Sequence, residues 1–239
     1  MRLRFASYNV HKGIGLDRKR DPERILSVLR EMDADIIALQ EVDRRVGARA
    51  SVLPRAMIDD SQWRVVPVAK RPRSIGWHGN ALLVRRELDV MGGHALDLPM
   101  LEPRGAVAGE LCIEGRFVRI FGTHLDLSGL RRREQVRALL DAAREAAGDW
   151  PSVIMGDFNQ WGRLTGAMDE FEPEWQLFTP GKSYPARAPL AVLDRIAATR
   201  HWQCRDSGVH RTALSSVASD HLPVWVDLEL PAPNKATEK

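Results

Sequence analysis

The sequence predicts an α/β fold. Two observations indicate this class. Apolar runs of strand length are continuous at residues 36–39 and 153–155, which is typical of strands covered on both faces. Between the predicted strands lie segments with helical periodicity, and each of these begins with a residue suited to a helix N-terminus.

Length and composition favour one domain. The chain has 239 residues, of which 44% are hydrophobic and 28% are charged, enough to bury one large core. No internal repeat or long linker divides it, so we expect a single domain over residues 1–230 and a disordered tail over 231–239. With 35 basic and 32 acidic residues the net charge is +3, which permits a phosphate-bearing partner without requiring one.

The first half of the chain predicts mainly strands, because short apolar or alternating runs are separated by turn-forming residues. One helix interrupts them: Asp21 is its N-cap, Pro22 occupies the first helical position, and apolar residues at helical spacing continue to near Met32. Residues 43–62 are irregular and arginine-rich, and 70–79 form a basic loop. The predicted strands of this half are residues 3–10, 35–40, 63–69, 81–84, 88–98 and 106–113.

The second half predicts one long helix. Ser128 is its N-cap, and apolar residues on one helical face extend it to about Ala147. Residues 162–189 are rich in glycine and proline, which predicts loops with one short helix. The predicted strands of this half are residues 116–123, 153–156, 192–196 and 223–230.

Polar residues stand where several predicted strands end. Residues two apart in a β-conformation point to the same side, so Asp157 and Asn159 can aim at one substrate. Alone, this pair fits an Asx-rich turn at least as well. The same arrangement recurs at other strand ends, and the repetition favours a shared site. Its candidate members are Asn9, Glu41, His124, Asp126, Asp157, Asn159, Asp194, Asp220 and His221.

The chemistry of this set points to a metal ion. Carboxylates gathered at one end of a sheet repel each other unless a cation neutralises them. The donors are mainly oxygens and the sequence has no H-x-H or C-x-x-C cluster, so Mg²⁺ or Mn²⁺ is favoured over Zn²⁺. A hard cation held by few carboxylates completes its shell with water and substrate phosphate. Hydrolysis of a phosphoester is therefore the expected reaction.

The order of these motifs resembles the endonuclease/exonuclease/phosphatase superfamily, whose members include deoxyribonuclease I, abasic-site endonucleases, neutral sphingomyelinases and inositol polyphosphate 5-phosphatases. Each block alone is modestly specific, but together they span nearly the whole chain. The resemblance implies a four-layer α/β/β/α sandwich, in which two packed mixed sheets lie between outer helices. The blocks are Ser7-Tyr8-Asn9-Val10-His11, Leu39-Gln40-Glu41-Val42, Gly79-Asn80-Ala81, Gly122-Thr123-His124-Leu125-Asp126, Gly156-Asp157-Phe158-Asn159, Leu193-Asp194-Arg195-Ile196 and Ser219-Asp220-His221-Leu222-Pro223.

The resemblance also implies roles for single residues. Glu41 would be the principal metal ligand, with Asn9 and Asp220 near the same ion. Asp157 would orient or deprotonate the attacking water, and Asn159 would help to hold the scissile phosphate.

Two histidines and two further residues complete the implied site. His221 would contact the phosphoryl oxygen or transfer a proton, and Asp194 would fix its tautomer. His124 would be a second phosphate-contacting histidine, or lie on the leaving-group side, and Asn80 would lie near the active site as a substrate-binding residue.

Plainer interpretations remain for several of these residues. His221 also fits an ordinary histidine at a strand edge, and Asp194 fits half of a surface ion pair with its neighbour. Asp126 is explained equally well by a turn that caps a helix. His11 and His78 are candidate pocket residues without an assigned role.

The substrate is less constrained than the reaction. The basic loop and the arginine-rich segment predict a rim for phosphate groups, although solvated surface loops have the same composition. Residues 183–189 resemble a bacterial subgroup of unassigned substrate that is often encoded near phospholipid-synthesis enzymes. A phospholipid or small phosphodiester is therefore expected, with a nucleic acid as the alternative.

Two other classes of protein fit the sequence less well. A calcineurin-like dinuclear phosphoesterase needs an early D-x-H and a later G-N-H-[DE], and the sequence has neither. A non-catalytic relative that only binds a phosphate ligand would have lost part of the acidic set, and the set is intact. We expect an enzyme, a Mg²⁺- or Mn²⁺-dependent phosphoric ester hydrolase, monomeric and cytoplasmic. The two separated cysteines and the absence of an apolar spanning segment agree with that compartment.

Overall fold

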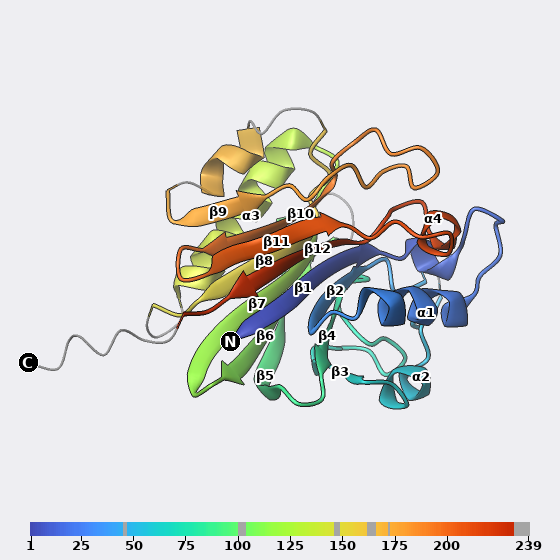
Figure 1. The fold of residues 1–239 in the computed structure, drawn as a ribbon, viewed down its shortest axis with the longest axis horizontal. Helices are drawn as coiled ribbons and strands as arrows, with labels where there is room; N and C mark the ends of the chain where they lie inside the picture. The colour runs from blue at the N-terminus through green and yellow to red at the C-terminus, as the bar shows by residue number, and fades with distance from the viewer. Residues whose placement is uncertain (45–46, 100–103, 146–148, 162–165, 172, 232–239) are drawn as a thin grey trace, which may run out of the picture.

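The computed structural model describes residues 1–44, 47–99, 104–145, 149–161, 166–171 and 173–231. Within these residues the strands form two six-stranded sheets that pack face to face (Figure 1). Helices cover the outer face of each sheet. The predicted α/β/β/α sandwich is confirmed.

The first sheet carries both ends of the described chain. Its order is β11-β12-β1-β2-β4-β3. Strands β1 and β2 are parallel, and their register pairs Asn9 with Gln40, so their carboxyl ends lie side by side. Its strands are β1 (Arg2–Asn9), β2 (Ile36–Gln40), β3 (Trp63–Val65), β4 (Ala81–Arg85), β11 (Gln203–Val209) and β12 (Val224–Glu229).

The second sheet has the order β5-β6-β7-β8-β10-β9. Strands β7 and β8 are parallel, whereas β8 and β10 are antiparallel. Its strands are β5 (Asp89–Leu96), β6 (Ala106–Ile113), β7 (Arg116–His124), β8 (Ser152–Asp157), β9 (Trp175–Phe178) and β10 (Asp194–Thr199).

Strand β2 shows why the apolar runs are continuous. Ile36 and Ala38 belong to the core between the two sheets. Ile37 and Leu39 point the other way, into the core beneath the outer helix. Because successive side chains alternate between two dry faces, each position favours an apolar residue. Burial of each larger side chain contributes about 1.5–3 kcal/mol.

The helices form the outer layers. In α1, the Asp21 carboxylate accepts a hydrogen bond of 3.0 Å from the backbone N–H of Arg24, and Pro22 follows the cap, as predicted. Ser128 stands at the N-cap of α3, but its side chain makes no capping hydrogen bond. The helices are α1 (Pro22–Met32), α2 (Arg55–Asp59), α3 (Gly129–Arg144) and α4 (Ser215–Ala218), with 3-10 turns η1 (His11–Gly13) and η2 (Gly166–Phe171).

Several elements differ from the predictions. Helices α2 and α4 and strands β9 and β11 were not expected, and β3 is shorter than residues 63–69. Strand β11 lies at a sheet edge and its first five residues are exposed, so it has no apolar alternation to reveal it. The predicted end of the long helix at Ala147 and the tail over 232–239 lie outside the described residues.

Candidate active site

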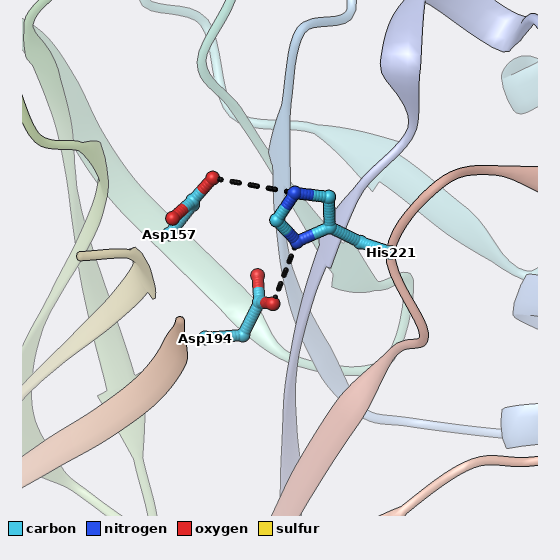
Figure 2. A group of neighbouring side chains, drawn as sticks. All are labelled: Asp157, Asp194 and His221. Atoms are coloured by element: carbon cyan, nitrogen blue, oxygen red, sulfur yellow. Dashed lines mark hydrogen bonds and ion pairs between the residues drawn. The ribbon is translucent and has the colours of Figure 1, made fainter. Parts of the chain in front are cut away.

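Strand register places three of the candidate residues on neighbouring strands. His124 at the end of β7 pairs with Asp157 at the end of β8. Asp194 at the start of β10 pairs with the same Asp157 from the other side. His221 precedes β12 in the first sheet, and its ring lies between Asp157 and Asp194 (Figure 2). The site therefore straddles the ends of both sheets.

Asp157 is the centre of this group and is only 2% exposed. Its Oδ2 accepts a hydrogen bond of 3.1 Å from Asn9 Nδ2, which reaches across from β1. The same oxygen lies 3.4 Å from His124 Nε2 and 3.7 Å from His221 Nε2. The backbone N–H of Asn159 donates to Oδ1 at 3.0 Å. Both carboxylate oxygens are thus held by the protein.

The close approach of β7 and β8 depends on Gly156. A Cβ at this position would stand 1.9 Å from the carbonyl oxygen of Thr123, its partner on β7. Only glycine fits against the neighbouring backbone there. The glycine of the Gly-Asp-Phe-Asn block therefore sets the spacing between His124 and Asp157.

A second carboxylate holds the other side of His221. Its Nδ1 lies 2.8 Å from Asp194 Oδ2, and Ser183 Oγ donates to the same oxygen at 2.6 Å. The ring of Tyr184 packs on the imidazole with centroids 4.8 Å apart. Because an ionised carboxylate only accepts hydrogen bonds, Nδ1 carries a proton and Nε2 is directed toward Asp157.

The pKa values of the two histidines beside Asp157 are shifted in opposite directions. Burial lowers the pKa of His221, but the carboxylates of Asp194 and Asp157 outweigh it and raise the pKa to about 10. Burial also lowers the pKa of His124. The carboxylate of Asp157 raises it by less than burial lowers it, so the pKa falls to about 3. The imidazolium of His221 and the neutral imidazole of His124 therefore face the same carboxylate at neutral pH.

The structure offers two places for a cation. Asp157, Asp194 and His221 each present one ligand atom, and these atoms lie within 4.8 Å of one another, so this buried group is able to hold an ion. Both ring nitrogens of His221 already face carboxylates, however. An imidazolium supplies there the positive charge that a metal would otherwise supply.

The predicted metal ligands lie beside η1. Glu41 follows β2 with φ of 57°, and its carboxylate forms an ion pair with Lys12 Nζ. Asp220 Oδ1 lies 3.8 Å from His11 Nδ1. Asn9, just before these two basic residues, accepts a hydrogen bond of 3.1 Å from the backbone N–H of His11. The donors that Glu41, Asn9 and Asp220 offer are all oxygens, so the donor set fits a hard divalent cation.

The remaining candidates support the loops around this site. Asn159 Nδ2 donates to the carbonyl oxygen of Leu125 at 2.9 Å, and Asn80 Nδ2 donates to that of Gly105 at 3.0 Å. Asp126 Oδ1 accepts a hydrogen bond of 2.9 Å from the backbone N–H of Ser128. This is the helix-opening turn that was the alternative interpretation of Asp126.

Sequence reasoning missed Lys12 and Ser183 as members of the site. Lys12 directly follows a quoted motif, and that adjacency was the only signal for it. Ser183 reaches Asp194 through a loop whose path no local pattern specifies. His78, named without a role, is half-buried in the basic loop beside the site.

A sequence model described as the endonuclease/exonuclease/phosphatase family matches residues 6–221. The chain belongs to this family. Its members are hydrolases that act on phosphoesters. No curated protein matches the chain.

Solved structures of the endonuclease/exonuclease/phosphatase family share the fold. A family member from Bacteroides vulgatus superposes with a TM-score of 0.77 at 19% identity, over 97% of this chain and 100% of that one. One from Beutenbergia cavernae gives 0.72 at 22% identity, over 97% and 72%. A mannosyl-6-phosphatase from Bacteroides thetaiotaomicron gives 0.72 at 18% identity, over 95% and 99%. At these identities the likeness shows the fold alone.

Proposed function

We propose that this protein is a divalent-metal-dependent phosphodiesterase, which hydrolyses a P–O bond by in-line attack of water. The observation that carries the proposal is the convergence of Asn9, His124 and His221 on the buried carboxylate of Asp157. Membership of a family of phosphoester hydrolases supports it. A chain that only binds phosphate has no need of a buried carboxylate directed at two histidines.

In this proposal each residue has a definite task. Asp157 accepts a hydrogen bond from the attacking water and takes its proton, while Asn159 helps to hold the scissile phosphate. The imidazolium of His221, held by Asp194, donates to a phosphoryl oxygen as its negative charge grows. His124, which is neutral and lies 3.4 Å from Asp157, either contacts the scissile phosphate or lies on the leaving-group side.

A metal ion adds one further contribution. Glu41, Asn9 and Asp220 are the residues that would hold it, with Mg²⁺ or Mn²⁺ suited to their oxygen donors. When bound, the ion supplies positive charge that stabilises the phosphoryl transition state. Members of this family generally use a divalent metal, which supports this assignment.

The substrate class has less direct support than the reaction does. One solved relative is a mannosyl-6-phosphatase and another, TDP2 from D. rerio, is complexed with a single-strand DNA product. A phospholipid or small phosphodiester is our first choice and a nucleic acid the alternative. None of the helices in the described part of the chain has the length and apolar character to span a membrane. We propose a single-domain, monomeric protein of the cytoplasm.

The test is turnover of bis(p-nitrophenyl) phosphate in the presence of Mg²⁺ or Mn²⁺. We expect hydrolysis that stops when the metal is removed with EDTA and returns when it is restored. Asp157→Asn and His221→Gln should each lower kcat by about 10²-fold or more. Cys112→Ala, a change far from the proposed chemistry, is the matched control and should leave kcat unchanged.

Two results would contradict the proposal. Absence of turnover on nucleic acid, phospholipid and sugar-phosphate substrates as well would favour the non-catalytic alternative. Full activity of both site variants would show that the reaction takes place elsewhere. Plasmid nicking compared with release of a phospholipid headgroup separates the nucleic acid from the lipid substrate.

A further inference from the structure

A cavity of about 290 Å³ lies directly beside the proposed catalytic group. His124, Glu41 and Lys12 form the wall that it shares with the site. The opposite wall comes from Asp43, Arg44 and Arg49, which follow β2, and from the basic loop before β4. We call this cavity the arginine pocket, and its lining includes Lys12, Glu41, Asp43, Arg44, Arg49, Arg71, Ser74, Trp77, His78, Arg104 and His124.

The lining carries an excess of positive charge. Five of its side chains are basic, one lysine and four arginines, and two are acidic, Glu41 and Asp43. Lys12 is already paired with Glu41, and Arg104 donates to the carbonyl oxygen of Leu125 at 3.0 Å. The other arginines are therefore the ones available to a ligand.

The side chains of those arginines make no hydrogen bond and no ion pair. This holds for Arg44, Arg49 and Arg71 within the part of the chain that the structure describes, where the carboxylate of Asp43 attracts Arg49 and Arg71 without pairing with either. This contrasts with arginines elsewhere on the surface, such as Arg137, which forms an ion pair with Glu170 at 2.9 Å. Several unpaired guanidinium groups around one cavity repel each other, and an anion removes that repulsion.

The loop that forms the far wall is held in place by its own backbone. Trp77 and Asn80 exchange backbone hydrogen bonds of 2.8 and 2.9 Å. The carbonyl of Gly79 accepts a hydrogen bond of 3.0 Å from Val42, next to Glu41. A Cβ on Gly76 would meet the carbonyl oxygen of Asn80 at 1.8 Å, so this turn requires a glycine. The pocket is thus a formed cavity attached to the site.

We propose that the arginine pocket binds a second phosphate group of the substrate, so that the substrate is a small phosphodiester that also carries a terminal phosphomonoester. The proposal rests on the proposed function, because the scissile phosphate is assigned to Asp157 and His221 next door. Guanidinium groups match phosphate with paired hydrogen bonds, and a doubly charged monoester gains more from them than a diester does. The cavity volume suits a phosphate with its linking group.

The experiment compares two probes that differ only in the second phosphate. They are thymidine 5′-(p-nitrophenyl phosphate) and the same compound phosphorylated on its 3′-hydroxyl. With Mg²⁺ present, we expect wild type to prefer the phosphorylated probe by about tenfold in kcat/KM. Arg49→Ala and Arg71→Ala should each remove most of that preference through a raised KM. Both should stay within about twofold of wild type on the plain probe.

The control is Arg30→Ala, which removes an exposed arginine from α1, away from the pocket. It should keep the preference. Equal kcat/KM for the two probes in wild type would overturn the proposal, as would pocket variants that weaken both probes equally.

A binding measurement separates this proposal from the proposed function. If neither probe is hydrolysed, the proposed function fails, and calorimetric titration with thymidine 3′,5′-bisphosphate still tests the pocket. Binding that weakens about tenfold in Arg49→Ala and Arg71→Ala, but not in Arg30→Ala, supports the pocket. No binding to wild type, or equal binding to all four proteins, overturns it.

Discussion

The Nδ1 atom of His221 lies 2.8 Å from Oδ2 of Asp194, and neither residue is exposed by more than 5%. The two residues are 27 positions apart: Asp194 begins β10 of the second sheet, and His221 lies just before β12 of the first. Asp194 therefore holds the imidazole from behind while the opposite ring nitrogen faces Asp157. Its proposed role is to position His221 rather than to touch the substrate.

Asp194→Asn should lower kcat by about 10²- to 10⁴-fold with little change in KM. The amide keeps the size of the side chain but no longer fixes the tautomer or stabilises the imidazolium. Thermal unfolding and steady-state kinetics on the diester probe check this. A variant that keeps both its Tm and its kcat would remove Asp194 from the mechanism.

The protonation states of the two histidines give a second prediction. In the metal-free protein, the imidazole nitrogen shifts of His221 and His124 should stay constant in NMR spectra between about pH 5 and 9. Their pKa values, about 10 and about 3, lie outside that range. In Asp194→Asn the pKa of His221 should fall, because a carboxylate that raises it is gone. A wild-type His221 that titrates near pH 6.5 would contradict this.

Acid should weaken the contact between η2 and α3. Glu170 accepts hydrogen bonds from Arg137 and Arg133, and these hold its pKa at about 2, below the ordinary 4.5. A carboxyl whose pKa is lowered by folding stabilises the protein above its unfolded pKa, and this is lost as pH falls through the folded value. The Tm of wild type should therefore approach that of Glu170→Gln between about pH 4.5 and 2. A constant difference across that window would show that the ion pairs contribute nothing.

Gly156→Ala should destabilise the protein by about 3 kcal/mol and lower Tm by about 6–12 °C. The added Cβ meets the Thr123 carbonyl oxygen at 1.9 Å, so β7 and β8 must separate. Gly92→Ala is the control, because Gly92 lies on the edge strand β5 and the nearest atom to its Cβ is Glu110 Oε2, at 3.7 Å. Differential scanning calorimetry compares the two. Equal Tm values would mean that β8 accommodates the methyl group.

The elements that the sequence predicts correctly are those determined by interactions between residues close together in the chain. The Asp21-Pro22 cap and the apolar run of β2 each identify their element without knowledge of its neighbours. Strand β11 exists because β12 offers it hydrogen-bonding partners from Gln203 to Val209. No pattern within its own seven exposed or half-buried residues reveals that partner.

The site residues likewise fall into two groups, those that local sequence identifies and those that depend on the tertiary fold. Asp157, Asn159 and His221 stand out because they follow or precede strands in recognisable motifs. The ion pair of Lys12 with Glu41 and the hydrogen bond of Ser183 to Asp194 depend on how loops return to the sheet ends. The arginine pocket depends on two loops that meet in space, so composition alone left it indistinguishable from ordinary surface.

The register of β7, β8 and β10 has a consequence for dynamics. His124, Asp157 and Asp194 stand side by side in a continuous backbone ladder, within the interior strands of their sheet. Their mutual geometry is fixed when the sheet forms, so little conformational entropy is left for a ligand to remove on binding. The amide protons of this ladder should exchange with solvent only in the slowest openings of the protein, and the chemical groups should be preorganised before any substrate arrives.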